Sequence, residues 1–150
     1  MRAGTLGRNM GKRDTDEMNT ELSQAKELKT FLEDNMENFS EVDFPHLLKA
    51  QIKKKKINKA QLAQKSGMSD VYLYQLLSGR RSPSRSRVIC ICIGLGLTVE
   101  ETQKILFHAG MGPLYARNRW DAIILYGISH ELDLFTINDL LYQENEKTLI

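Results

Sequence analysis

Residues 58–83 have the sequence NKAQLAQKSGMSDVYLYQLLSGRRSP. Asn58 is a typical helix N-cap, and Gln61, three residues later, fits the capping-box pattern. Gly67 can adopt the left-handed conformation that ends a helix, and Ser69 is a typical cap for the next one. The stretch therefore predicts two short helices joined by a tight turn, the second over residues 69–78. The apolar side chains predicted to face inward on the second helix are Leu73, Leu76 and Leu77.

The same stretch lies in a block of positive charge. Residues 46–93 carry eleven Lys and Arg side chains and one acid, Asp70, although the formal net charge of the chain is only +2. The flanking residues 18–45 and 94–150 carry net charges of −5 and −4. Positive charge focused on one helical unit is typical of a surface that binds phosphates, so nucleic acid is the first partner to consider. The bases are Lys49, Lys53, Lys54, Lys55, Lys56, Lys59, Lys65, Arg80, Arg81, Arg85 and Arg87.

Length and composition are those of a soluble domain with a short extension. The chain has 150 residues, of which 41% are hydrophobic and 27% are charged. No apolar run approaches the ~18 residues that span a membrane, and the N-terminus lacks the apolar core of a secretory signal. Cys90 and Cys92 lie in one apolar run, which indicates buried, reduced thiols. We therefore expect a cytoplasmic protein without a membrane partner.

The N-terminal part divides into two predicted segments. Residues 1–17 contain few apolar side chains, which predicts disorder. Residues 18–40 are predicted to form one amphipathic helix with an acidic outer face. Its apolar face must cover either its own domain or a second copy of the chain. The apolar stripe consists of Met18, Leu22, Ala25, Leu28, Phe31, Leu32, Met36 and Phe39.

Further helices are predicted on both sides of residues 58–83. Asp43 is a suitable N-cap for a helix with Pro45 in its first turn, ending near Lys53–Lys56. The apolar run Val88–Ile93 has the composition of a buried strand. We predict a helix there because Ser84 provides a cap and every neighbouring element is helical.

The second half of the chain contains a possible internal repeat. Shifting by 35 residues aligns Val88–Phe107 with Ile123–Tyr142, and the predicted helix caps Thr98 and Asp133 then coincide. Common helix patterns can produce such a likeness by chance; otherwise it predicts two similar helical hairpins packed in series. Residues 111–150 are accordingly predicted to form a C-terminal helical hairpin.

The stretch at residues 58–83 resembles the helix-turn-helix of the phage repressor and Cro family. The likeness covers about residues 44–107. It implies an all-α protein with a lambda-repressor-like five-helix DNA-binding domain at residues 44–110, between the N-terminal amphipathic helix and the C-terminal hairpin. The matching features are Leu62-Ala63, Gly67, Ser69, Leu73, Leu76, the exit loop Gly79-Arg80-Arg81-Ser82-Pro83, and Leu97-Thr98-Val99-Glu100-Glu101.

The resemblance further implies that the second helix reads the major groove of double-stranded DNA. Gln75 can then bond an adenine edge, and Val71 can contact a thymine methyl group. Lys59 stands where the family often has a Gln that binds the DNA backbone, and Arg80 and Arg81 are implied to grip phosphates. The DNA-binding residues predicted in this way are Lys59, Ser69, Asp70, Val71, Tyr74, Gln75, Arg80 and Arg81.

Some residues depart from the family pattern and leave alternatives open. Asp70 brings a negative charge close to DNA, which is useful only if it accepts a hydrogen bond from a cytosine amine. Tyr72 and Tyr74 are bulkier than the side chains common there, and either pack between helices or contact DNA. Lys53–Lys56 either contact DNA or form a solvated face. A sequence-specific transcriptional regulator is the first hypothesis, and a protein-interaction module on the same scaffold is the second.

Catalytic and metal-binding patterns are not found. His46, His108 and His130 lack metal-ligand spacing, and no nucleophile or phosphate-loop motif occurs. We therefore expect neither an enzyme nor a cofactor nor a bound metal.

A homodimer is implied by analogy with the family. Its interface would come from the helix at residues 18–40 or from the hairpin at residues 111–150. Trp120, flanked by Arg119, either closes the core between the two hairpins or belongs to an epitope for a protein partner.

Overall fold

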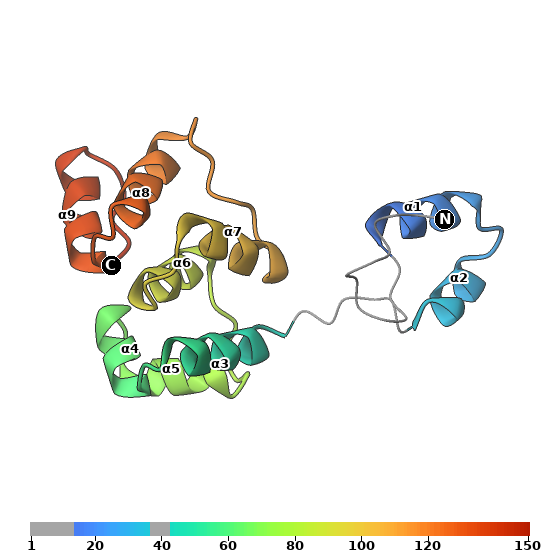
Figure 1. The fold of residues 1–150 in the computed structure, drawn as a ribbon, viewed down its shortest axis with the longest axis horizontal. Helices are drawn as coiled ribbons and strands as arrows, with labels where there is room; N and C mark the ends of the chain where they lie inside the picture. Colours follow the sequence, from blue (N-terminus) through green and yellow to red (C-terminus); the bar gives the residue numbers. More distant parts are fainter. Residues whose placement is uncertain (1–13, 37–42) are drawn as a thin grey trace. The chain divides into compact units, whose positions relative to one another are not determined.

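The computed structural model describes residues 14–36 and 43–150, and in these ranges it contains nine helices and no strand (Figure 1). The all-α prediction is confirmed. The chain divides into two compact units, residues 1–41 and residues 42–150. The predicted helix-turn-helix domain and the predicted C-terminal hairpin both belong to the second unit.

The first unit corrects the prediction of a single amphipathic helix. It contains two helices, α1 (Thr15–Gln24) and α2 (Leu28–Asp34), and the chain becomes extended at Ala25, with ψ of 134°. Folding back lets Phe31 become buried and lets the Asn35 Nδ2 donate to Glu21 Oε1 over 2.8 Å. One continuous helix over these residues would form neither contact, which explains the break.

The start of α1 also corrects part of the prediction that residues 1–17 are disordered. Asp14 caps α1 by accepting a hydrogen bond from the Glu17 amide over 2.7 Å, so residues 15–17 are helical. The rest of that prediction, residues 1–13, and the end of the predicted helix, residues 37–40, lie outside the described residues.

The second unit begins with five helices. They are α3 (Phe44–Lys55), α4 (Lys59–Lys65), α5 (Asp70–Leu77), α6 (Arg85–Gly94) and α7 (Val99–His108). Each begins after a side chain that accepts a hydrogen bond from the third residue of the helix, as expected for N-caps. These caps, all five of which the sequence predicts in this role, are Asp43, Asn58, Ser69, Ser84 and Thr98.

The helix α6 occupies the centre of this unit. Every residue from Val88 to Gly94 is buried, and α6 contacts α4, α7 and α9 (Leu134–Gln143) (Figure 1). A helix covered on several sides needs no polar face, which accounts for its strand-like composition. Burial raises the pKa of the Cys90 thiol to about 11 and that of Cys92 to about 12, so both thiols stay protonated at neutral pH.

The predicted repeat is present as two equivalent hairpins. The second consists of α8 (Arg119–Ser129) and α9, and a shift of 35 residues maps the bounds of α7 onto those of α9. The left-handed residues that end the helices also coincide: Gly96 (φ 68°) with Glu131 (φ 57°), and Gly110 (φ 72°) with Asn145 (φ 58°). The likeness therefore extends from the apolar pattern to the backbone conformation of the turns.

Polar side chains join the second hairpin to the five helices. The Arg85 guanidinium donates to the carbonyl oxygens of Gly112 and Pro113 over 2.9 and 2.8 Å, and lies 3.5 Å from the carboxylate of Asp121. Asp121 is buried and also accepts from the Tyr115 amide over 2.8 Å. A basic residue of the charged block thus holds the α7–α8 connection in place.

Trp120 packs against the core of the second unit, in agreement with the first of its two predicted roles. Its ring is half-buried against the core, and its indole Nε1 donates to the backbone oxygen of Lys147 over 2.7 Å. The side chain therefore links α8 to the segment that follows α9, and its indole N–H donates within the second unit.

Glu101 gives the second unit a pH-dependent contribution to stability. It forms a capping box with Thr98 and accepts from the Lys55 ammonium over 3.4 Å. The backbone hydrogen bond from Thr98, together with Lys55, lowers the pKa of Glu101 below its ordinary value of 4.5. A lowered pKa stabilises the fold above pH 4.5, and this contribution is lost as the pH falls through the folded-state value.

We predict that Glu101→Gln lowers the free energy of unfolding at neutral pH by about 0.5–1 kcal/mol. Urea denaturation at neutral pH and at an acidic pH well below the ordinary value of 4.5 checks this. The difference between wild type and variant should shrink at the lower pH, whereas an equal difference at both values would show that the charge contributes nothing.

Candidate nucleic-acid interface

The helix α5 has one buried and one exposed face. Leu73, Leu76 and Leu77 are buried, whereas Val71 and Tyr74 on the opposite side are 67% and 60% exposed. Asp70 is also exposed. An exposed face with a Val and a Tyr suits contact with base edges and methyl groups.

The turn before α5 is fixed by the rest of the unit. Gly67 is left-handed, with φ of 65°, and the Met68 amide donates to the Ala63 carbonyl over 3.0 Å. A Cβ atom at Gly67 would lie 3.0 Å from Leu134 of α9 and 3.1 Å from Ile150. The second hairpin therefore packs directly on the turn that orients α5.

The exit from α5 brings Arg80 and Arg81 back against the helix. Their backbone amides both donate to the Gln75 carbonyl, over 3.0 and 3.3 Å. In addition, the Arg81 Nε donates to the Gln75 side-chain Oε1 over 3.0 Å. The structure thus connects the predicted base-reading residue to a predicted phosphate-binding residue.

Tyr72 holds two arginines by cation–π contacts. The Cζ atoms of Arg81 and Arg87 lie 5.2 and 5.5 Å from the centre of its ring, and the ring is half-buried. Tyr72 therefore packs within the unit and also orients charged groups. Sequence reasoning missed Arg87, because its nearness to Tyr72 depends on where the tertiary fold places α6 relative to α5. The only signal in the sequence was its place in the basic block.

The other basic side chains differ in whether they already form ion pairs or hydrogen bonds within the unit. Lys54 and Lys55 lie 3.7 and 3.4 Å from the Glu101 carboxylate, and Arg85 is engaged with the α7–α8 connection. Lys59 is exposed at the start of α4, the end remote from the turn. The structure therefore brings together the predicted residues from Ser69 to Arg81 around α5, and places Lys59 on a separate helix.

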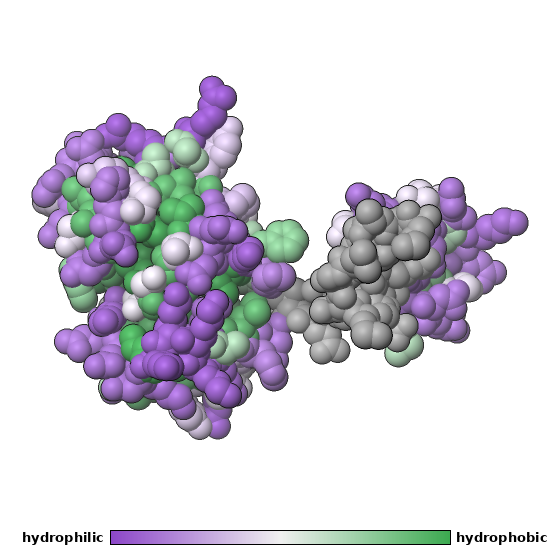
Figure 2. All heavy atoms as spheres, in the orientation of Figure 1, coloured by the Kyte–Doolittle hydropathy of each residue, from purple (hydrophilic) through white to green (hydrophobic). Residues whose placement is uncertain are grey.

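The described residues offer little for other kinds of site. They contain no group of three or more His, Cys, Asp or Glu side chains placed to hold a metal ion. In the same ranges, every helix is too short or too polar to cross a bilayer. In Figure 2, hydrophilic side chains cover much of the visible face of the second unit, with hydrophobic side chains between them.

Comparison with known families agrees with this geometry. Residues 48–101, from α3 to α7, match a family model described as helix-turn-helix. The chain contains a helix-turn-helix domain. The match confirms the resemblance predicted from residues 58–83 and supports DNA binding of the general helix-turn-helix kind. The comparisons with curated proteins and with solved structures gave no match.

The contacts of Tyr72 lead to a prediction about DNA binding. Tyr72→Leu should weaken binding to every duplex by about tenfold, because two guanidinium groups lose their orientation. Tyr72→Phe keeps the aromatic face and should bind within about twofold of the wild type. Fluorescence anisotropy, with circular dichroism to confirm folding, provides the measurement, and equal losses in both variants would exclude the cation–π role.

Proposed function

We propose that the chain is a sequence-specific, double-stranded DNA-binding transcriptional regulator that inserts α5 into the major groove. The observation that carries the proposal is the exposed face of α5, with Val71 and Tyr74 outward and Arg80 and Arg81 at its end. Such a helix places side chains near base edges while the arginines neutralise backbone phosphates.

Individual roles follow from this arrangement. Ser69 caps α5 by accepting from the Tyr72 amide over 3.0 Å, and its hydroxyl hydrogen remains free to donate to a phosphate. Asp70 would accept from a cytosine amine, and Val71 would contact a thymine methyl group. Lys59 would contact the backbone separately from α5. The site of action would be the cytoplasm, as the sequence predicts.

Gln75 is proposed to read an adenine. Its Oε1 accepts from Arg81 but has a second lone pair, so it can also accept from the adenine N6 amine while its Nε2 donates to N7. Gln75→Ala should cost about 1–3 kcal/mol at one base position and relax preference there. Binding to a set of single-base variants of the selected site measures this. An equal loss on all sequences would leave Gln75 only the role of holding Arg81.

The proposal is tested by anisotropy with a random duplex of about 30 base pairs, long enough for two half-sites, across a salt series. DNA selected from a randomised pool is then measured in the same way. We expect salt-dependent binding that becomes tighter on the selected sequence. A folded protein that binds neither duplex near physiological salt would contradict the proposal and favour a protein partner for the exposed Val71 and Tyr74.

A homodimer is part of the proposal, because two copies on two half-sites would double the contacts. Light scattering after gel filtration, with and without the selected duplex, measures the number of copies. A monomer in both conditions would contradict dimerisation without affecting the contacts proposed for α5.

A further inference from the structure

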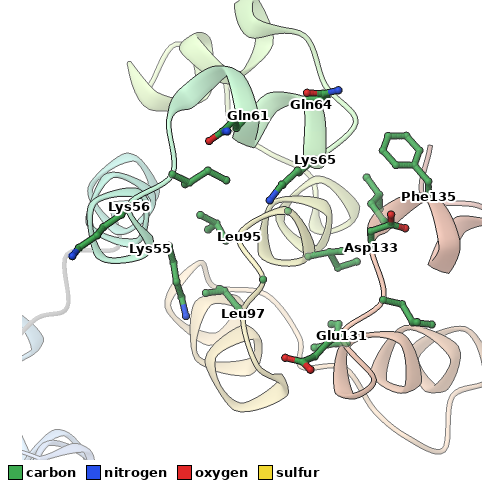
Figure 3. Close-up of a pocket in the computed structure, with 17 residues that line it drawn as sticks. Lys55, Lys56, Gln61, Gln64, Lys65, Leu95, Leu97, Glu131, Asp133 and Phe135 are labelled. Atoms are coloured by element: carbon green, nitrogen blue, oxygen red, sulfur yellow. The ribbon is translucent and has the colours of Figure 1, made fainter.

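A cavity of about 670 Å³ lies within the second unit, on the side of α4 (Figure 3). Its walls come from three places: the end of α3 with α4, the turn between α6 and α7, and the turn between α8 and α9. The last two are the equivalent turns of the repeated hairpins. The volume falls within the range of about 300–1,000 Å³ that is usual for small-molecule sites.

The cavity has an apolar part formed by aliphatic side chains of these turns. A ligand that fills it must therefore carry an apolar group of moderate size. Of these side chains, Ile57 and Leu132 are half-buried and open to a ligand, and five more lie beneath them in the core: Ile93, Leu95, Leu97, Ile128 and Leu134.

One ammonium group is available to a ligand. Of the three lysines that line the cavity, Lys55 is bonded to Glu101 over 3.4 Å, and Figure 3 shows Lys56 directed away from the cavity. Lys65 points into it (Figure 3), and no acid of the described residues lies within ion-pair distance of its ammonium. Lys65 can therefore bind a carboxylate without giving up an existing ion pair.

One carboxylate is available on the opposite wall. Asp133 already accepts from the Thr136 amide over 2.8 Å as the cap of α9. Glu131 forms no ion pair with the described residues, and in Figure 3 its carboxylate is directed to the side of the cavity where Leu97 lies.

Glu131 lies at the left-handed end of α8, the position equivalent to Gly96 of the first hairpin, and both residues line the cavity.

We propose that this cavity binds a small zwitterion with an apolar side group, of the class of the aliphatic and aromatic α-amino acids. The carboxylate of the ligand pairs with Lys65, its ammonium pairs with Glu131, and its side group packs on the aliphatic residues. This inference does not depend on DNA binding, because none of the contacts involves α5.

The test uses the full chain without DNA and three probes, L-leucine, L-methionine and L-phenylalanine. Amide NMR spectra recorded during titration should show saturable shifts at Gly96, Leu97 and Leu132. Phenethylamine and 3-phenylpropionate, which keep one charge each, should bind about tenfold more weakly than phenylalanine. Lys65→Met and Glu131→Gln should each weaken phenylalanine binding by a similar factor, and Lys104→Met, remote from the cavity, should leave it unchanged.

The pattern of losses separates the proposed contacts from nonspecific binding. Lys65→Met should not affect phenethylamine, and Glu131→Gln should not affect phenylpropionate, because each analogue lacks the group that the mutated residue binds. Both side chains are exposed, so both variants should keep the wild-type melting temperature. The proposal is overturned if none of the three amino acids causes saturable shifts at the cavity up to about 10 mM, or if the one-charge analogues bind equally well.

Discussion

Gly94→Ala is expected to lower the free energy of unfolding by about 2 kcal/mol, the range found for overpacked cores. A Cβ atom at Gly94 would meet the hydroxyl of Ser66 and lie 3.1 Å from the Ser66 amide nitrogen and 3.2 Å from the Lys65 carbonyl carbon. Because two of these atoms belong to the backbone, rotation of one side chain does not relieve the contact. The helices α4 and α6 must move apart.

The matched control for this variant is Gly112→Ala. Gly112 has no atom within 4 Å of an added Cβ, and its φ is not left-handed, so the substitution should change stability by less than about 0.5 kcal/mol. Urea denaturation of both variants provides the comparison. Similar stabilities would show that α4 and α6 are not in close contact at Gly94.

Ser66→Ala tests the same contact from the other side. The Ser66 hydroxyl is buried and has no hydrogen-bond partner among the described residues, so its removal should be neutral or stabilising. In the double variant, part of the loss caused by Gly94→Ala should be recovered, because the closest of the three contacts is removed. Additive effects would exclude direct coupling of these residues.

Helix caps and helix ends, which depend on residues a few positions away in the chain, were predicted correctly from the sequence. Asn58, Ser69 and Thr98 cap helices because their side chains bond amides only three residues away, and Gly67 ends α4 because glycine tolerates a left-handed backbone. The helix at Val88–Ile93 was also predicted by its cap, although its composition suggested a strand. The 35-residue shift also predicted that Thr98 and Asp133 cap equivalent helices.

Features that depend on tertiary packing were not predictable. Arg85 and Arg87 are two residues apart in the basic block, yet one holds the α7–α8 connection and the other lies over Tyr72. No pattern in the sequence distinguishes them. The break at Ala25 was missed for a similar reason, because the spacing of the apolar residues is the same in one long helix and in two helices that fold back.

Replacing Arg80 and Arg81 together by Ala should weaken DNA binding by about a hundredfold near physiological salt, or about tenfold for each charge-assisted contact. Most of the loss should be common to random and selected duplexes, because phosphates carry no sequence information, and release of the Gln75 side chain should add a smaller loss on the selected duplex. The slope of log K against log salt should flatten by about two units, one for each arginine. Anisotropy across a salt series measures all three quantities.

The control removes two positive charges elsewhere, by Lys104→Ala with Arg117→Ala. Both side chains are exposed and lie outside α5 and its exit loop, so this variant should keep the wild-type salt slope. If the two double variants lose affinity equally, net charge alone explains the binding. If the Arg80 and Arg81 variant binds DNA as tightly as the wild type, the exposed face of α5 does not meet DNA in the proposed orientation, and Val71 and Tyr74 become the candidate contacts for a protein partner.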